Sequence, residues 1–183
     1  TLVVTPTDHR RFLGGAGIVA AHAAELGAKA TLITVIGNDE TGDFAKGMLS
    51  KYGVAGAEVI DESRPTTLKQ RFRADKKTLL RVSHLHQHSV SPAIQDELFT
   101  RVYSNLADAD LIVFSDFNYG LLSPDICNYI MHSAKKNNVA VSVDCQISSQ
   151  TGDLQKYRGA KLVTPTEVEA RSALKDFDSG IAY

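Results

Sequence analysis

The sequence predicts an α/β protein built on a doubly wound sheet of parallel strands with helices on both faces. Apolar runs with strand character alternate along the chain with amphipathic helical patterns, and this order favours parallel strands joined by right-handed crossovers. Residues 66–83 break the alternation and are typical of two strands around a polar turn, a β-hairpin. We therefore expect an α/β core that carries a small hairpin insertion.

The first helix is expected directly after the diglycine Gly14-Gly15. Apolar residues recur at helical spacing through residues 15–26, and Gly27 suits the position just past a helix end. An apolar strand should follow at residues 30–36. Glycine lets a backbone approach a ligand, and a helix N-terminus offers free N–H groups. Gly14 and Gly15 are therefore candidate contacts to an anion or a sugar hydroxyl, and the alternative is a tight turn that packs helix on sheet.

Two later helices have a recognisable start. Ser91 and Ser123 each precede a proline, which fits an N-cap followed by Pro at the first helical position. The first of these helices should extend to Leu106. Further strands are expected at residues 1–4, 57–60, 111–115, 139–144 and 161–164.

Two of the predicted strands carry aspartates at their carboxyl ends, Asp116 and Asp144. Ligands of open parallel sheets bind beyond the carboxyl ends of the strands. Both aspartates are therefore candidate site residues in the central cleft, although each could simply cap the loop that follows it.

The predicted hairpin carries a row of cations. Strand alternation places Lys69, Arg71 and Arg73 on one face, and Arg81 is available from the returning strand. Such a row is either a solvated face that guards a sheet edge or a lid that holds a substrate phosphate.

Composition limits the partners and the compartment. The chain has 183 residues, 43% of them hydrophobic, and a formal charge of −1, so no global field draws it to nucleic acid or to an anionic membrane. No apolar run approaches the roughly 20 residues of a membrane helix. Cys127 and Cys145 do not resemble a disulfide framework, which favours the cytoplasm. Because the first residue is Thr1, the chain is interpreted as a fragment.

Three local motifs admit other interpretations. Residues 15–20 match the G-x-G-x-x-A dinucleotide fingerprint, with Asp39 as a possible ribose ligand, but a polar linker rather than a strand precedes them. His84, His86 and His88 alternate and could present three imidazoles to a metal, or could form a polar loop. The run Thr166-Glu-Val-Glu169 is a capping box, which opens a helix without any further role.

Four stretches of the chain, taken in order, resemble one family of enzymes. They are residues 13–44, residues 64–73 with 78–83, residues 111–123, and residues 141–146 through 155–170. Together they resemble the ribokinase-like (PfkB) carbohydrate kinases, and most closely the heptose-phosphate kinase branch. The resemblance implies one kinase domain over residues 1–183, with a three-layer ribokinase-like core and a β lid formed by residues 57–85.

The resemblance also implies an activity and a set of site residues. It implies an ATP-dependent kinase that uses Mg²⁺, binds a sugar or sugar phosphate and forms a homodimer through the lid. The expected substrate-binding residues are Gly14, Gly15, Lys69, Arg71, Arg81 and Asp116. Asp144 and Thr166 belong to the expected nucleotide and phosphate region, and Glu169 is expected to organise the metal.

Several positions depart from the family pattern. Ile18 and Thr166 stand where the family usually has Asn, and Tyr119 and Gln146 stand where the heptose-kinase branch typically has Lys. The family's first strand and its G-A-G-D segment, which carries the general base, have no counterpart in the sequence, so the fold is expected to be incomplete at both ends. We therefore expect no catalytic base in this chain and no activity from the chain alone. The alternative is a pseudokinase that binds sugar phosphate or nucleotide without turnover.

Overall fold

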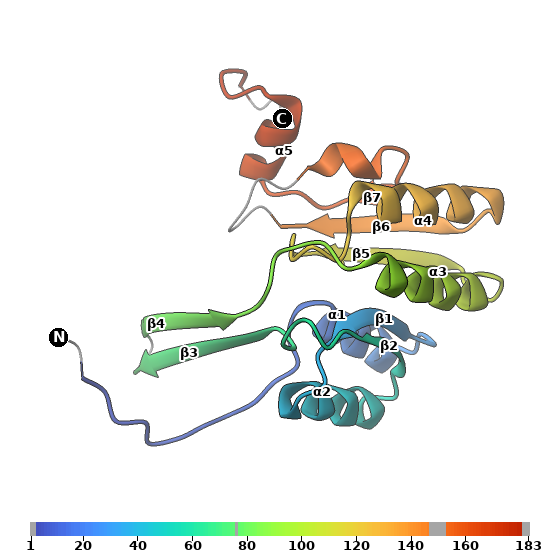
Figure 1. Cartoon of the computed structure of the whole chain (residues 1–183). Coiled ribbons are helices and arrows are strands. Elements are labelled where there is room, and N and C mark those ends of the chain that lie inside the picture. The colour runs from blue at the N-terminus through green and yellow to red at the C-terminus, as the bar shows by residue number, and fades with distance from the viewer. Residues whose placement is uncertain (1–2, 76, 147–152, 181–183) are drawn as a thin grey trace. The chain divides into compact units, whose positions relative to one another are not determined.

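The computed structural model describes residues 3–75, 77–146 and 153–180 of the chain (Figure 1). The chain forms two compact units, Thr1–His86 and Gln87–Tyr183. Each unit contains parallel strands with helices between them, and the first unit also contains an antiparallel hairpin.

The first unit is built on a short βαβ arrangement. Helix α1 (Gly15–Glu25) leads to β1 (Thr31–Ile36), and α2 (Glu40–Lys51) connects β1 to the parallel strand β2 (Ala55–Ile60). The side chain of Asp39 accepts a hydrogen bond from the Gly42 amide and caps the start of α2. Helix α1 and β1 confirm the expectation for residues 15–36, and β2 begins two residues before its predicted start.

The apolar core of this unit is small. Ala21 from α1 and Leu49 from α2 are buried together with Val54, just before β2. Half-buried side chains surround them, including Leu13 and Ile18. The alanine-rich face of α1 allows α2 to approach, because small side chains keep the helices close together.

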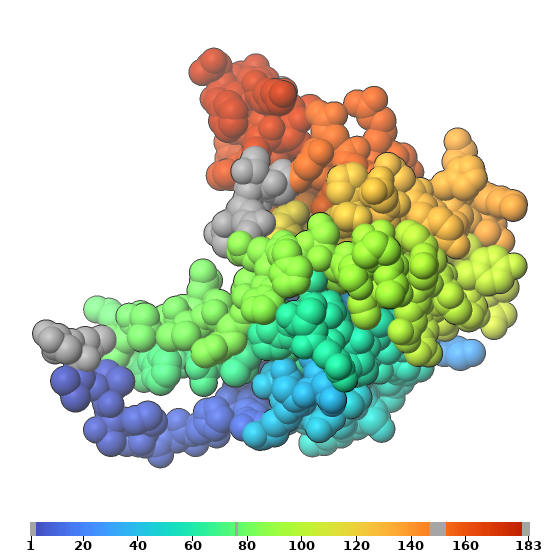
Figure 2. Space-filling view, viewed as in Figure 1, coloured from blue at the N-terminus to red at the C-terminus, as the bar shows by residue number. Residues whose placement is uncertain are grey.

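The hairpin follows as a separate two-stranded sheet. Strands β3 (Leu68–Ala74) and β4 (Lys77–His84) are antiparallel, with a shift of register between Phe72 and Arg73. The pair extends as a ribbon away from α1 and α2 (Figure 1), and its residues lie at the surface in the space-filling view (Figure 2). The hairpin predicted for residues 66–83 is confirmed.

The second unit has three parallel strands in the order β5-β6-β7. Its elements, in chain order, are α3 (Pro92–Leu106), β5 (Leu111–Asp116), α4 (Pro124–Lys136), β6 (Ala140–Cys145), the 3₁₀ turn η1 (Leu154–Tyr157), β7 (Leu162–Val163) and α5 (Glu167–Leu174). Ser91 and Ser123 accept hydrogen bonds from the third residue of α3 and α4 respectively, as the Ser-Pro pairs predict.

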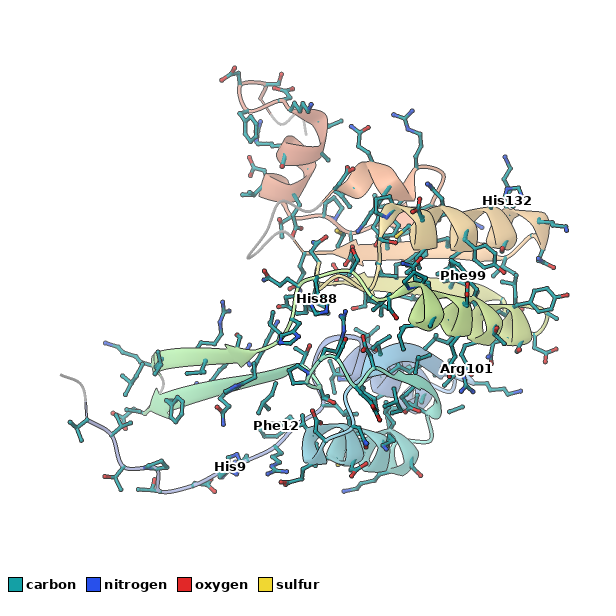
Figure 3. The ribbon with its side chains drawn as sticks, viewed as in Figure 1. His9, Phe12, His88, Phe99, Arg101 and His132 are labelled. Carbon is teal, nitrogen blue, oxygen red and sulfur yellow. The ribbon has the colours of Figure 1, made fainter. Side chains whose placement is uncertain are left out.

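The core of this unit is formed by α3, α4 and one face of the sheet. Helices α3 and α4 each bury residues at a spacing of four, and the strands bury alternate residues. The buried side chains include Leu98, Val102, Leu106, Phe114, Ile126, Ile130, Ala134, Val141 and Val143. Phe99 of α3 (Figure 3) contacts Tyr129 of α4, with ring centroids 4.2 Å apart. Leu111 and Val113, on the opposite face of β5, are 54% and 48% exposed.

One predicted strand does not form. Val3 and Val4 have no regular structure, and residues 1–2 lie outside the described residues. Val3 is 85% exposed, so its side chain enters no core, and neither Val3 nor Val4 pairs with a strand among the described residues. No helix in the described part of the chain is long and apolar enough to cross a membrane.

Candidate active site

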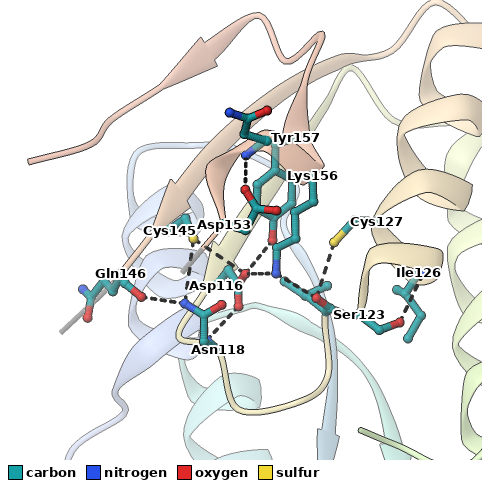
Figure 4. A network of polar contacts seen from close by, with 12 residues as sticks. Asp116, Asn118, Ser123, Ile126, Cys127, Cys145, Gln146, Asp153, Lys156 and Tyr157 are labelled. Atoms are coloured by element: carbon teal, nitrogen blue, oxygen red, sulfur yellow. Dashed lines mark hydrogen bonds and ion pairs between the residues drawn. The ribbon is translucent and has the colours of Figure 1, made fainter. Parts of the chain in front are cut away.

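Asp116 anchors a polar network at the carboxyl end of β5 (Figure 4). Its side chain is 3% exposed, and its Oδ2 atom lies 2.7 Å from both Lys156 Nζ and Tyr157 Oη. The thiol of Cys145 also points at Oδ2, at 3.7 Å, and the amide of Asn118 donates to Oδ1 at 2.8 Å. Both carboxylate oxygens therefore contact protein donors, which come from β6, η1 and the loop after β5.

The same network fixes the loop of residues 117–122. Asn118 has a left-handed backbone (φ 56°), and its Nδ2 atom donates to the carbonyl of Gln146 at 2.7 Å. Gly120 has φ 82°, and a Cβ atom there would collide with the backbone of His88. Lys156 Nζ holds the end of the loop by donating to the Leu122 carbonyl at 2.8 Å.

Burial keeps the two thiols and the phenol of this network protonated. Burial, followed by the charge of Asp116, raises the pKa of Cys145 to about 11. The same two causes raise the pKa of Tyr157, and burial raises the pKa of Cys127. These groups stay hydrogen-bond donors at neutral pH, and both thiols are free and buried.

The two strand-end aspartates do not meet. Asp116 is the register partner of Cys145, whereas Asp144 is the partner of Ser115. Successive side chains of a strand point to opposite faces, so Asp116 lies on the helix-covered face and Asp144 on the other. The sequence places both at the carboxyl edge, but only Asp116 is buried.

The hairpin brings two of its predicted cations together. Arg71 is paired directly across the ladder with Arg81, and Lys69 is paired with Ser83, so these four residues share one face. Both arginines are exposed, and neither forms an ion pair within the described residues. Like charges directly opposite each other are unfavourable unless an anion lies between them.

The loop that leads from β2 to the hairpin is held by a second network. Asp61 and Arg64 form an ion pair at 2.8 Å, with side chains only 6% and 8% exposed. Thr66 donates its amide to Asp39 Oδ2 at 2.8 Å, and its Oγ1 atom accepts from the Gly37 amide at 2.9 Å. Beside these groups lies an open cavity of about 450 Å³, lined by Asn38, Asp39, Glu62, Ser63, Arg64 and Pro65.

Hydrogen bonds in this network stabilise the charged carboxylates. Burial by itself raises the pKa of Asp61, but donors from Ser63 and Arg64 outweigh it and hold the pKa below its usual value. Burial likewise opposes the lowering of the Asp39 pKa, and the amides of Thr66 and Gly42 outweigh it.

The diglycine forms the start of α1. Gly14 is the N-cap, with no side chain capping the helix, and Gly15 has a left-handed φ of 53°. A Cβ atom on Gly14 would meet nothing within 4 Å. Gly15 is thus needed for the backbone geometry, whereas Gly14 leaves open space in front of the helix.

Ile18 packs into the core of the first unit. It is half-buried against Ala21, Leu49 and Val54. An asparagine at this position would lose this apolar contact.

Thr166 and Glu169 form the predicted capping box at the start of α5. The Thr166 amide donates to Glu169 Oε2 at 2.7 Å, and the Glu169 amide donates to Thr166 Oγ1 at 3.4 Å. Glu169 is 7% exposed. Among the described residues, no three histidine, cysteine or acidic side chains gather to hold a metal ion.

Two alternative interpretations lose their support. The stretch before α1 has no strand in residues 3–14, so the dinucleotide fingerprint lacks its structural context, and Asp39 is engaged as a helix cap. His84 Nε2 contacts the Gln70 side chain at 3.1 Å, and the alternating histidines form no metal cluster in the part of the chain that the structure describes.

The parallel strands, the hairpin and the glycine-led helix α1 define an α/β protein with a hairpin insertion, and a comparison with protein families gives its class. The chain belongs to the pfkB family of carbohydrate kinases, whose model matches residues 2–181. Its fold is ribokinase-like, as predicted.

Similar proteins include two curated bacterial enzymes. The chain is 40% identical over 163 residues to the D-beta-D-heptose 7-phosphate kinase of Bordetella bronchiseptica, covering 88% of this chain and 49% of that protein. It is 32% identical over 171 residues to the bifunctional protein HldE of Campylobacter curvus, covering 93% and 35%. The chain thus spans between 35% and 49% of the length of these two relatives.

The solved structures support the fold alone. The tetrameric inhibited form of phosphofructokinase-2 from Escherichia coli matches with a TM-score of 0.68 and 19% identity, covering 88% of this chain and 52% of that one. A ribokinase from Giardia lamblia matches with a TM-score of 0.63 and 17% identity, covering 85% and 48%.

Sequence reasoning missed part of the site. It identified Asp116 but not Lys156, Tyr157 or Asn118, the residues that surround its carboxylate. Residues 155–159 (QKYRG) offered a signal, because they place a lysine next to a tyrosine in an otherwise polar turn. Their partner lies about 40 residues away in the sequence, and only the packing of η1 beside the end of β5 brings them together.

Proposed function

We propose that this chain is part of an ATP-dependent carbohydrate kinase that transfers the γ-phosphate of ATP to a hydroxyl of a sugar or sugar phosphate, in the manner of a heptose-phosphate kinase. Membership of the pfkB family supports the reaction class. The heptose 7-phosphate kinase among its relatives supports an acceptor that itself carries a phosphate.

The observation that carries the proposal is the pair formed by Arg71 and Arg81 across the hairpin. Two guanidinium groups on one exposed face suit a phosphate, because arginine can donate two parallel hydrogen bonds to an oxyanion. Lys69 lies on the same face and adds a third cation. A neutral sugar would leave the guanidinium groups of Arg71 and Arg81 facing each other without compensation.

The other site residues have more general roles. Gly14 and Gly15 present the start of α1 to the sugar, and Asp144 and Thr166 belong to the nucleotide and phosphate region. Asp116 supports the substrate site from beneath the loop that follows it. Catalysis of phosphoryl transfer depends mainly on positioning and on stabilising charge. None of the described residues is assigned as the general base.

Mg²⁺ would accompany ATP in this reaction. Mg²⁺ usually takes one or two carboxylates and completes its shell with water and substrate phosphates. Glu169 can supply one such carboxylate, although its Oε2 atom already accepts the Thr166 amide. The described residues do not form a complete metal cage, so the phosphates of ATP would supply part of the coordination.

We also propose an assembly and a compartment. The hairpin exposes Leu79 and Leu80, at 42% and 51%, which suits a homodimer that joins two lids. The domain would be a single kinase domain with residues 57–85 as its lid. A soluble sugar kinase of the cytoplasm, without nucleic-acid or membrane partners, agrees with the near-neutral charge.

The test is ATP turnover by the natural protein that contains this chain, with Mg²⁺, against heptose 7-phosphate, fructose 6-phosphate, ribose and adenosine. We expect turnover with a phosphorylated acceptor. The 183-residue chain alone should transfer no phosphate. Turnover with ribose or adenosine only would contradict the role given to the arginine pair.

A pseudokinase is the second candidate, and the residues at four family positions favour it. Ile18, Tyr119, Gln146 and Thr166 replace groups that bind sugar or phosphate in the resembling enzymes. Binding of nucleotide or sugar phosphate without turnover would support this candidate. In that case the double variant Tyr119→Lys with Gln146→Lys should improve binding or transfer, and no gain would argue against loss of an ancestral activity.

A further inference from the structure

Lys156 is a buried cation that touches two different segments. Its side chain is 9% exposed, and its Nζ atom lies 2.7 Å from Asp116 Oδ2 and 2.8 Å from the Leu122 carbonyl. It also lies over the ring of Tyr157, 5.2 Å from the centroid. One ammonium group therefore joins η1, the end of β5 and the end of the loop that precedes α4 (Figure 4).

Stability alone is a poor explanation for this ion pair. Removing two charges from water is costly, and replacing a buried pair with apolar side chains is often neutral or stabilising. The same loop also holds Asn118 and Gly120 in left-handed backbone conformations. A left-handed asparagine costs free energy, and such strain persists where the surroundings fix a conformation that function requires.

The loop carries two aromatic side chains beyond the end of β5. The rings of Phe117 and Tyr119 stack with centroids 6.1 Å apart and an interplanar angle of 19°. They follow the carboxyl end of a parallel strand, which is where ligands of such sheets bind. Asn118, between them, is tied to the Asp116 carboxylate and to the Gln146 carbonyl. The loop thus connects the ends of β5 and β6 as one unit.

We infer that Lys156 is a positioning residue: through Asp116 and the Leu122 carbonyl it fixes the loop of residues 117–122 in the conformation that presents Tyr119 to the bound substrates. This inference rests on the proposed kinase function. Lys156 is not a catalytic residue, because its ammonium is already bound by the protein and does not reach outward. Its effect passes through the loop.

The test compares three variants of the natural protein. Lys156→Met removes the cation and leaves the Asp116 carboxylate uncompensated. The double variant Asp116→Asn with Lys156→Met removes both charges, and Lys156→Arg keeps the pair. Lys136→Met, at an exposed position at the end of α4, is the matched control. Thermal unfolding, hydrogen exchange of the amides of residues 118–122, and kcat and KM are measured for each.

We expect Lys156→Met to lower the unfolding temperature and to expose the loop amides to exchange. The double variant should recover the unfolding temperature but not the protection of the loop. Its kcat should stay lower than that of the wild type by about 100-fold, as expected for misplaced groups near the reaction. Lys156→Arg should restore most of the protection and activity, and Lys136→Met should match the wild type.

Two results would overturn the inference. One is a double variant that regains both loop protection and kcat, because the pair would then serve stability only. The other is a Lys156→Met variant in which the amides of residues 118–122 exchange hydrogen as slowly as they do in the wild type. If the wild-type protein transfers no phosphate to any acceptor, the kinase proposal fails, while the exchange measurement still decides whether Lys156 holds the loop.

Discussion

Arg71 and Arg81 are register partners in the antiparallel hairpin, so two like charges share one exposed face of a two-stranded sheet. This arrangement is unfavourable in the free protein and favourable around an anion. A hairpin that needed charge only to guard an edge would gain nothing from placing two arginines directly opposite each other.

The first prediction concerns this pair. Arg71→Ala and Arg81→Ala should each raise the KM for a phosphorylated acceptor by roughly tenfold, as expected for the loss of one charge-assisted contact. The kcat should change little, and the KM for a neutral sugar should not change. Steady-state kinetics at two salt concentrations would check this, since added salt should weaken the wild-type interaction most.

The control for the arginine pair is Arg101→Ala. Arg101 lies on α3 (Figure 3) and is paired with Glu97, so its loss should leave KM unchanged. An equal rise in KM for neutral and phosphorylated acceptors in the hairpin variants would contradict a phosphate-binding role.

The second prediction separates the two glycines at the start of α1. Gly14→Ala should fold with wild-type stability, because its Cβ atom has open space, and should still weaken sugar binding if the ligand approaches the backbone there. Gly15→Ala should lower the free energy of unfolding by roughly 1 kcal/mol, because alanine is strained at a left-handed φ. Urea unfolding and acceptor KM measure the two effects. An unchanged acceptor KM in Gly14→Ala would mean that Gly14 is not part of the sugar-binding site.

The third prediction concerns Ile18. Ile18→Asn places an amide against Ala21, Leu49 and Val54. The free energy of unfolding should fall by about 1 to 3 kcal/mol, the cost of burying a polar group without a partner. Ile18→Val should cost less, because it keeps the apolar contact. Greater stability in Ile18→Asn, measured by urea unfolding, would mean that the side chain turns away from this core.

The fourth prediction concerns acid stability. The folded-state pKa of Asp61 lies below its unfolded value of about 3.9, so its stabilising contribution is complete above that pH. The contribution is lost as the pH falls through the folded-state pKa. The wild type should therefore lose stability below about pH 4, and Asp61→Asn should be less stable at pH 7 but change less between pH 4 and pH 2.

Urea unfolding at pH 7, 4 and 2 measures this effect. Asp39→Asn should behave similarly, because hydrogen bonds also lower the pKa of Asp39. If Asp61→Asn and the wild type lost stability in parallel below pH 4, the Asp61–Arg64 pair would not be a source of the pH dependence.

The fifth prediction concerns the thiols. Cys127 and Cys145 are buried, and burial raises the pKa of each, so both should resist alkylation at pH 8 in the folded protein. Both should react once urea unfolds the chain. Mass spectrometry after iodoacetamide treatment measures the modification. Fast reaction of Cys145 in the folded state would mean that the network around Asp116 opens readily.

Much of the fold was predictable because its determinants are local. Ser91 and Ser123 cap their helices as the Ser-Pro pairs indicate, and Thr166 and Glu169 form the expected capping box. Such signals act over three or four residues, so the sequence displays them directly. The hairpin was equally visible, because its alternating strands lie next to each other in the chain.

Two features of the fold depended on partners that lie outside the local sequence. Residues 1–4 have strand character, but an apolar run becomes a strand only where another strand pairs with it, and Val3 and Val4 have none. Asp116 and Asp144 both end strands, yet parity within the register places them on opposite faces. The position of each aspartate in the sequence indicated the edge of the sheet at which it lies, but not the face to which its side chain points.

The sequence by itself determined the helices, most of the strands, the hairpin with its row of cations and the resemblance to the kinase family, whereas the direct opposition of Arg71 and Arg81 came from the register of the structure. Only the tertiary structure decided that Lys156 and Tyr157 surround Asp116 and that Ile18 belongs to the core. Periodicity reports which face of an element is apolar, because that depends on neighbours within a few residues. The partner of a buried charge depends on which distant segment packs beside it, and no local pattern records that choice.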